Sequence, residues 1–337
     1  MNFFGGPEAL EALSQRGDPL QRLGQTVDFE SFRAELERAL CKPAKGPGGA
    51  PRWDAVPMFK LLVLQRLYHL SDEQAEYQVG DRLSFRRFLG LGLCEAVPDS
   101  RTVWVFRETL VEAGTLERLF AAYRDQLLGA GLITREGSLV DASFVTVPKQ
   151  RNTREENEQV KQNQVPADWS PQKRAHKDRD ARWTRKGLET FFGYKNHVKV
   201  DRASKLIVSY KVTPASANDG AQLPDLVGPE DRVVHADCAY NRELVREHLR
   251  SLGIRACLQM KGTRHVQLTP AQRQTNRWHA RTRVRVEQVF ALIKNCIKGE
   301  HLLYIGQKRI AAALALTNLL HNALRVGQLR ALAAAKA

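Results

Sequence analysis

The fold of this chain is decided by the stretch Ser138-Leu139-Val140-Asp141-Ala142-Ser143-Phe144-Val145. The stretch is short and mostly apolar, and the helical spacing of the residues before it ends here. Its one charged residue, Asp141, lies within the run, where an unpaired charge is costly. Because successive side chains of a strand alternate between faces, one acid can emerge from an otherwise buried segment. We therefore predict a first strand that presents Asp141 to a site.

Further strand-like segments follow this stretch. Residues 192–200 and 206–213 predict an antiparallel hairpin, residues 232–236 predict a strand that ends at Asp237, and residues 255–258 predict a last short strand. Helical segments are predicted between and after them, at 218–227, 241–252, 276–298 and 309–332. This order predicts an α/β fold with a mixed five-stranded sheet and helices on its faces.

Residues 1–130 have a helical pattern. Apolar positions recur at helical spacing over 29–40 and 56–70, and residues 42–51 between them form a basic link rich in Pro and Gly. Ser71-Asp72-Glu73-Gln74 has the form of a capping box, and Asp99 precedes another helix. We predict an all-helical N-terminal region that binds DNA or dimerises, with Arg101 as one DNA contact. A plain helical bundle explains the same pattern.

The second predicted domain, residues 131–337, contains a long basic insertion at about 148–187. The insertion carries many lysines and arginines, Lys149 and Arg151 among them, and few apolar residues. This composition predicts a flexible segment and not a core element. Two compatible interpretations remain. The insertion is a solvated loop in the free protein, or it is a basic arm that becomes ordered on a DNA backbone.

The composition limits the class of protein. The net charge is +15 and the pI about 9.8, which favours polyanionic partners, although a soluble basic protein has the same numbers. Five scattered cysteines without a C-x-x-C disfavour a disulfide framework and a zinc site and suit a reducing cytoplasm. The N-terminus has no signal-peptide pattern, and the longest apolar stretch, 310–316, is too short for a bilayer. We expect a cytoplasmic, nucleoid-associated protein without a membrane partner.

Three acids carry the predicted chemistry. Asp141 and Asp237 lie within or just after strands, and Glu287 lies on a helix that also carries Arg283 and Lys294 on one face. Clustered carboxylates can hold two divalent ions, which stabilise both oxygens of an in-line displacement at phosphorus. The basic pair would then grip phosphates. Taken singly, an Asp after a strand is more often a turn or cap residue, and Glu287 an ordinary surface ion-pairing residue.

These motifs together resemble a known family. Asp141 stands in V-D-A-S, Asp237 in H-A-D-C-A-Y, and Arg283, Glu287 and Lys294 in the spacing R-x3-E-x6-K. The combination resembles bacterial insertion-sequence transposases of the DDE class, in particular the group named after insertion sequence 5. The segment 192–197, Phe-Gly-Tyr-Lys-Asn-His, adds to the resemblance. The chain departs from the signature at one position.

That position holds Ala280, where the family usually has a tyrosine three residues before the arginine. Trp278 or His279 is the candidate to replace the tyrosine's contact beside the phosphate. The departure concerns the DNA contacts and leaves the three acids in place.

The resemblance implies a ribonuclease H-like catalytic core. It makes Asp141, Asp237 and Glu287 the catalytic residues and the ligands of two Mg²⁺ ions, for which Mn²⁺ substitutes. The implied reaction is metal-dependent cleavage at transposon ends, followed by transfer of the 3′-hydroxyl strand into target DNA by direct transesterification. The implied partners are double-stranded DNA, both terminal inverted repeats and target, and a second copy in a homodimer on DNA. The alternatives are an endonuclease of the same fold that does not join strands and a catalytically silent DNA-binding regulator.

Several other residues have weaker signals. Arg264 and His265, in a turn before the Glu287 helix, are candidate DNA contacts. Trp169 and Trp183 are candidates for stacking on bases, whereas the helical spacing around Trp104 predicts a core position. His235 is expected to pack within the sheet, and His197 in the hairpin is expected to be structural or to face DNA; neither is expected to bind metal. Ser143 lacks a G-x-S-x-G elbow, which argues against a serine hydrolase.

Overall fold

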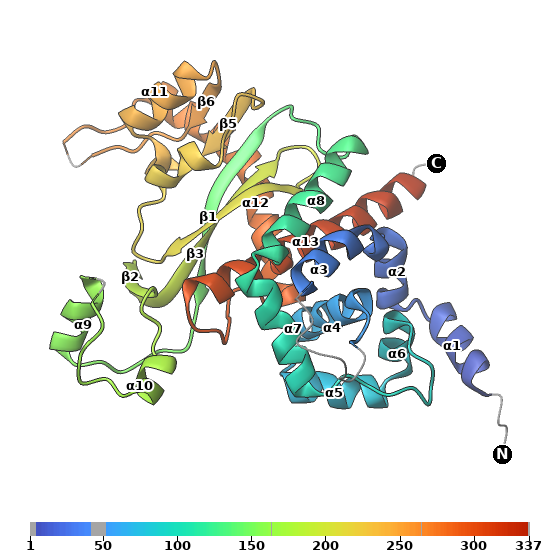
Figure 1. Cartoon of the computed structure of the whole chain (residues 1–337). Coiled ribbons are helices and arrows are strands. Elements are labelled where there is room, and N and C mark those ends of the chain that lie inside the picture. The colour runs from blue at the N-terminus through green and yellow to red at the C-terminus, as the bar shows by residue number, and fades with distance from the viewer. Residues whose placement is uncertain (1–4, 42–51, 163, 264, 336–337) are drawn as a thin grey trace. The chain divides into compact units, whose positions relative to one another are not determined.

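The computed structural model describes residues 5–41, 52–162, 164–263 and 265–335 (Figure 1). The predicted link at 42–51 lies outside the described residues. The chain forms two compact units. The first comprises Met1–Gln126, Cys296–Lys298 and Ala315–Ala337, and the second Leu127–Asn295 and Gly299–Leu314. The final third of the chain therefore contributes to both units.

The first unit is helical, as the sequence predicts. Its helices are α1 (Gly5–Gln15), α2 (Pro19–Thr26), the 3-10 helix η1 (Phe29–Phe32), α3 (Arg33–Leu40), α4 (Ala55–Tyr68), α5 (Asp72–Asp81), α6 (Leu83–Leu89), α7 (Ser100–Glu112) and most of α8 (Thr115–Gly129). Its core contains edge-on aromatic contacts among Phe29, Phe32, Phe59 and Phe88. Such geometry adds to the gain from burying these rings.

Local capping sets where two of these helices begin. The Ser71 hydroxyl accepts from the backbone N–H of Gln74, whose side chain in turn accepts from the Ser71 N–H, so the predicted capping box is confirmed. The Asp99 carboxylate accepts from the N–H of Thr102 at the start of α7. Trp104 on α7 is wrongly predicted as core: it is 48% exposed. Helical spacing locates an apolar stripe without fixing which positions at its margin become buried.

The second unit contains the sheet, whose strands are β1 (Ser138–Thr146), β2 (Arg182–Lys186), β3 (Glu189–Asp201), β4 (Ile207–Pro214), β5 (Val233–Ala236) and β6 (Arg255–Leu258). Its spatial order is β2-β3-β1-β5-β6, with β4 also paired to β3. The β1–β3, β2–β3 and β3–β4 pairs are antiparallel, and the β1–β5 and β5–β6 pairs are parallel. The sheet is mixed, as predicted, but it has six strands and not five, because the basic insertion supplies β2.

Helices complete this unit: α9 (Arg154–Lys161), α10 (Pro171–Ala175), the 3-10 helices η2 (Gly220–Asp225) and η3 (Cys238–Tyr240), α11 (Glu243–Ser251), most of α12 (Pro270–Ile297) and the start of α13 (Gln307–Ala334). Figure 1 shows α11 beside β5 and β6. The strand order β4-β3-β1-β5-β6 with flanking helices is that of a ribonuclease H-like fold.

Both faces of β1 are covered by apolar residues. Val140 packs with Val234, Tyr240 and Leu249 in one cluster. Val145, an odd number of residues away and therefore on the opposite face, packs with Phe192, Tyr194 and the first residues of α13. Burial on both faces fixes the register of β1, and the register fixes the direction of Asp141.

Gly193 permits the close approach of β1 and β3. Its φ is +148°, and a Cβ at this position would stand 2.2 Å from the backbone oxygen of Val145. Any side chain would force the two strands apart. This requirement explains the glycine within the segment Phe-Gly-Tyr noted in the sequence.

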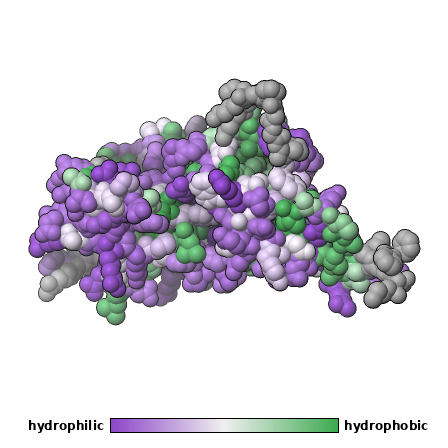
Figure 2. Space-filling model, turned by 60° about the horizontal axis from the view of Figure 1, so that its bottom comes forward, coloured by the Kyte–Doolittle hydropathy of each residue, from purple (hydrophilic) through white to green (hydrophobic). Residues whose placement is uncertain are grey.

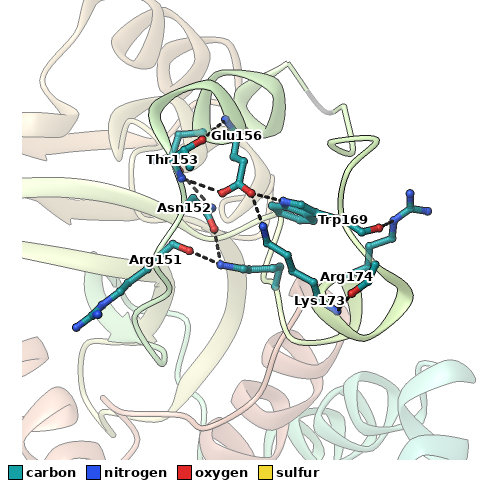
Figure 3. A network of polar contacts seen from close by, with 10 residues as sticks. Arg151, Asn152, Thr153, Glu156, Trp169, Lys173 and Arg174 are labelled. Carbon is teal, nitrogen blue, oxygen red and sulfur yellow. Dashed lines mark hydrogen bonds and ion pairs between the residues drawn. The ribbon is translucent and has the colours of Figure 1, made fainter.

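The basic insertion contains regular structure where the sequence predicts little. Figure 3 shows its central contact: the Glu156 carboxylate, at the first turn of α9, accepts from the Trp169 indole N–H and from Lys173. Glu156 also closes a capping box with Thr153. Trp169 is 2% exposed, so this tryptophan is unavailable for stacking on bases. A polar network around one aromatic residue thus replaces an apolar core.

Buried Asp178 joins the insertion to the sheet. Its carboxylate accepts from the Tyr194 hydroxyl on β3 at 2.7 Å and from the N–H groups of Ala181 and Gly306 at 2.9 and 3.0 Å. These bonds hold β2 at its place beside β3.

The surface face in Figure 2 is largely hydrophilic, with hydrophobic residues in small separate patches. Among the described residues, no helix is long and apolar enough to cross a membrane.

Candidate active site

The site lies where two parallel strands separate. β1 and β5 pair only at Ser138↔Val234 and Leu139↔His235, after which the two strands diverge. Asp141 follows on β1, and Asp237 follows the last residue of β5. The carboxyl ends of parallel strands that part in this way leave a crevice in which ligands bind. Both acids are therefore at the place in the sheet that the sequence predicts.

Each acid has one local backbone contact. The Asp237 carboxylate accepts from the N–H of Ala239 and caps η3, which is the turn-residue role weighed for it from sequence. The Asp141 carboxylate accepts from the N–H of Ala142 at 2.8 Å. A capping bond uses one lone pair of a carboxylate and leaves acceptor capacity for a cation.

Arg283 on α12 holds the other side of Asp141. Its Nη2 donates to Asp141 Oδ2 at 2.9 Å, and its Nη1 donates to Gln259 Oε1 at 3.0 Å. Both members of the ion pair are partly buried, with side chains 17% and 19% exposed. The sequence predicts a phosphate contact for Arg283, whereas in this structure its guanidinium binds the Asp141 carboxylate.

The electrostatics indicate a shared acidic site. Burial raises the pKa of Asp141 above its usual value, Arg283 opposes that rise, and the charge of Asp237 adds to it. Asp237 is therefore near enough for its charge to act on the Asp141 carboxylate. A site of this kind favours occupation by a cation.

Tyr240 also belongs to the site, although the sequence analysis did not select it. Its ring is buried, and burial raises the pKa of its hydroxyl, with further increases from the charges of Asp141, Asp219 and Asp237. Within the described part of the chain its hydroxyl has no hydrogen-bond partner. The residue is the tyrosine of H-A-D-C-A-Y, so its position three residues after Asp237 was the available signal.

The third acid, Glu287, is exposed on α12 and is not grouped with the other two. Across the described ranges, no three His, Cys, Asp or Glu side chains are placed to hold a metal ion. Asp141 and Asp237 alone fit a Mg²⁺ site of the kind built from one or two carboxylates, waters and phosphate oxygens. Burial raises the pKa of Asp141 and the charge of Asp237 adds to that rise, and a bound cation would oppose both effects.

The predicted DNA contacts are spread over the surface. Lys294 pairs with Glu300 at 2.9 Å. Arg101, Lys149, Arg151 and His265 are exposed, and Arg264 lies outside the described residues. The backbone oxygen of Arg151 accepts from Lys177. Of the two residues considered in place of the family tyrosine, Trp278 is 53% exposed and His279 is buried.

His197 and His235 are buried, as expected of structural residues. His197 Nε2 lies 2.8 Å from the Thr213 hydroxyl, and His235 packs near Trp278 and His279. Burial lowers the pKa of each histidine to about 4, so both rings are neutral at pH 7.

The amino-acid sequence matches two described families. Residues 8–109 match "Transposase domain (DUF772)", and residues 133–323, more than half of the chain, match "Transposase DDE domain". The chain belongs to the DDE transposase family. The transposase is thus an enzyme that acts on DNA, and its family generally uses divalent metal ions.

Solved transposase structures are distantly similar. The piggyBac synaptic complex with hairpin DNA has 10% identity and a TM-score of 0.46, over 92% of this chain and 75% of that chain. The Mos1 paired-end complex has 10% identity and a TM-score of 0.20, over 77% of this chain and 83% of that one. The Mos1 pre-cleavage complex has 12% identity and the same TM-score, over 85% and 80%. The family assignment of the transposase depends on the sequence matches alone.

Proposed function

We propose that the transposase cuts DNA at transposon ends and joins the released 3′-hydroxyl strand to target DNA, with Asp141, Asp237 and Glu287 as ligands of two Mg²⁺ ions. The observation that carries the proposal is the position of Asp141 and Asp237 where β1 and β5 diverge, with Asp237 close enough for its charge to contribute to the raised pKa of Asp141. When bound, such ions stabilise the attacking and leaving oxygens of an in-line displacement at phosphorus. Mn²⁺ has the same ligand preference and is expected to substitute.

Glu287 is proposed as the third ligand from its place on α12. It lies one helical turn after Arg283, so both residues share one side of the helix. Arg283 reaches Asp141 at 2.9 Å, which puts that side of α12 toward the site. Val286, Val289 and Ile293 are buried and fix the rotation of the helix. We propose that the exposed Glu287 side chain turns toward the other two acids to complete the ligand set.

Arg283 is proposed to change partners during the reaction. Before DNA binds, its guanidinium partly neutralises Asp141. A DNA phosphate, like a carboxylate, offers two anionic oxygens, and the arginine guanidinium can donate to both oxygens of either group. Transfer of Arg283 to phosphate releases Asp141 for cation binding. Cation and DNA should consequently bind with positive coupling, each raising the affinity for the other.

The finer family and assembly are part of the same proposal. The R-x3-E-x6-K spacing of Arg283, Glu287 and Lys294 supports the insertion-sequence-5-like group, with the exposed Trp278 as the replacement for the tyrosine lost at Ala280. The helical N-terminal region is proposed to bind the terminal inverted repeats. Processing two ends together favours a homodimer on DNA, in the cytoplasm at the nucleoid.

The metal site is tested by cleavage of DNA that contains the element's own ends, in Mg²⁺ or Mn²⁺. We expect Asp141→Asn, Asp237→Asn and Glu287→Gln each to reduce cleavage at least about 100-fold while DNA affinity in EDTA stays within a factor of about two. The matched controls are Asp168→Asn and Glu247→Gln, two exposed acids outside the site. Cleavage by Glu287→Gln equal to that of Glu247→Gln would remove Glu287 from the ligand set.

Two other functions give different outcomes. With pre-cut ends and a target plasmid, a nuclease without strand joining yields no joined product although it cuts uncut ends. A silent regulator yields neither product, and its DNA binding and cellular effect survive Asp141→Asn unchanged. Joined product that disappears in Asp141→Asn supports transposition.

A further inference from the structure

One exposed aromatic side chain of the second unit has no role in the site described above. Trp183, on β2 in the basic insertion, is 48% exposed. Its ring lies against Phe192 with centroids 5.0 Å apart, and the Lys149 ammonium stands 5.8 Å from its centroid. Exposing an indole ring to water is unfavourable. An indole beside a cation can instead stack on a flat aromatic ring while the cation pairs with a neighbouring phosphate.

Space for such a ring lies beside Phe192 and Lys149, the two residues that contact the Trp183 indole. Lys149, Phe191, Phe192 and His301 contribute to the lining of an open hollow of about 740 Å³ between the end of β1 and the start of β3. A hollow of this volume accepts a nucleotide. Its walls combine aromatic rings with a lysine, the pairing by which proteins bind unstacked bases and their phosphates.

The indole is held in a fixed position. β2 pairs with β3 through five residues, and Asp178 ties the preceding turn to Tyr194 and Gly306. The network of Figure 3 fixes the two helices that lead to β2. A ligand therefore does not have to order the segment on binding, which preserves affinity.

The geometry also relates Trp183 to the acids. Trp183 is paired with Phe192, and Asp141 with Val198. Phe192 and Val198 are six residues apart on β3, so both pairs face the same side of the sheet. Six residues of strand span about 20 Å, which equals roughly six stacked nucleotides.

We propose that Trp183, Lys149 and Phe192 form a binding site for one unstacked base of the DNA substrate, about six nucleotides from the phosphate that is cut. Trp183 stacks on the base, Phe192 supports the indole from below, and Lys149 pairs with the adjoining phosphate. The site rests on the DNA transposase function, but it requires neither the ions nor the cleavage step. A purely structural role for Trp183 predicts instead that its loss lowers stability and leaves binding unchanged.

The test is a binding measurement in EDTA with fluorescein-labelled DNA: a blunt duplex, and the same duplex with a ten-nucleotide thymidine 3′ extension. Trp183→Ala is expected to weaken binding of the extended DNA about 10-fold and of the blunt duplex less than two-fold. Trp104→Ala is the matched control, since Trp104 is equally exposed but lies on α7. Trp183→Phe keeps a flat ring and should retain most of the affinity.

Three results overturn the proposal. These are equal losses for both DNAs, no loss for either, or the same selective loss in Trp104→Ala. A urea unfolding midpoint for Trp183→Ala within experimental error of the wild type shows that a binding loss is not a folding loss. If the selective loss appears in EDTA while the wild type fails to cleave in Mg²⁺, the base site stands and the proposed metal site falls.

Discussion

Replacing Gly193 by alanine tests whether the close approach of β1 and β3 sets the geometry around Asp141. The new Cβ would stand 2.2 Å from the Val145 oxygen, where ordinary contact begins at 3.4 Å, so the strands must separate locally by about 1 Å. The φ of +148° adds backbone strain for any L-residue, about 1–3 kcal/mol. Two backbone hydrogen bonds adjoin this point, Val147 N–H to Phe192 and Ala215 N–H to Gly193, each worth about 1 kcal/mol. Together these effects predict a loss of about 3–5 kcal/mol in the free energy of unfolding.

The assay is urea denaturation followed by circular dichroism, with two glycines as references. Gly253 has a φ of +69° and open space around it, so Gly253→Ala should cost about 1–2 kcal/mol from conformation alone. Gly80 lies inside α5 with nothing near its Cβ position, and Gly80→Ala should stabilise by about 0.5–1 kcal/mol. Equal costs for Gly193→Ala and Gly253→Ala would refute the argument, because the contact with Val145 would then have no energetic weight.

Three further predictions concern buried polar groups. Burial lowers the pKa of His197, His235 and His321 from 6.5 to about 4. The folded state therefore binds fewer protons than the unfolded state, so the stabilisation is fully present above about pH 6.5 and the free energy of unfolding falls toward pH 4 by roughly 3 kcal/mol per histidine. Urea titrations at pH 7 and pH 5 measure this fall, and an unchanged free energy of unfolding would mean that the rings are solvated. Tyr240→Phe removes a buried hydroxyl and should stabilise the metal-free protein by about 1 kcal/mol. The same substitution should slow cleavage roughly 10-fold at unchanged DNA affinity. Cleavage as fast as or faster than that of the wild type would show that the hydroxyl takes no part in the reaction. Asp178→Ala should cost about 3 kcal/mol by calorimetry and abolish the selective binding of extended DNA, whereas exposed Asp168→Ala should change neither.

The parts of the fold that could be predicted from sequence are those encoded by local periodicity. β1 and the β3–β4 hairpin alternate or run apolar over five or more residues, and the capping box at Ser71 is complete within four residues. The positions of Asp141 within β1 and of Asp237 directly after β5 can be predicted for the same reason, since each strand is recognisable by itself.

The basic insertion could not be predicted because its order comes from pairings between distant polar residues. Glu156 and Trp169 are 13 residues apart, and Asp178 and Gly306 are 128 apart. Composition measures apolar content and therefore assigns such a segment to disorder. Trp183 was one of several equivalent tryptophans in the sequence; only the burial of Trp169 and the position of Trp104 on a different unit distinguish it.

Arg283 shows the same limit at the site itself. Spacing on α12 puts it one turn from Glu287, but its partner Asp141 is 142 residues earlier in the chain. Local rules describe what favours folding, whereas the site contains groups that oppose it. These are a partly buried carboxylate with a raised pKa, a nearby second carboxylate, and a buried tyrosine hydroxyl for which the described chain supplies no partner. Each of these groups costs stability in the free protein, and in the proposed reaction a bound cation would offset the cost at the two carboxylates. The residues that fit folding worst are thus the ones whose chemistry best fits the proposed reaction, which is the expected relation when a fold is built to hold a charged ligand.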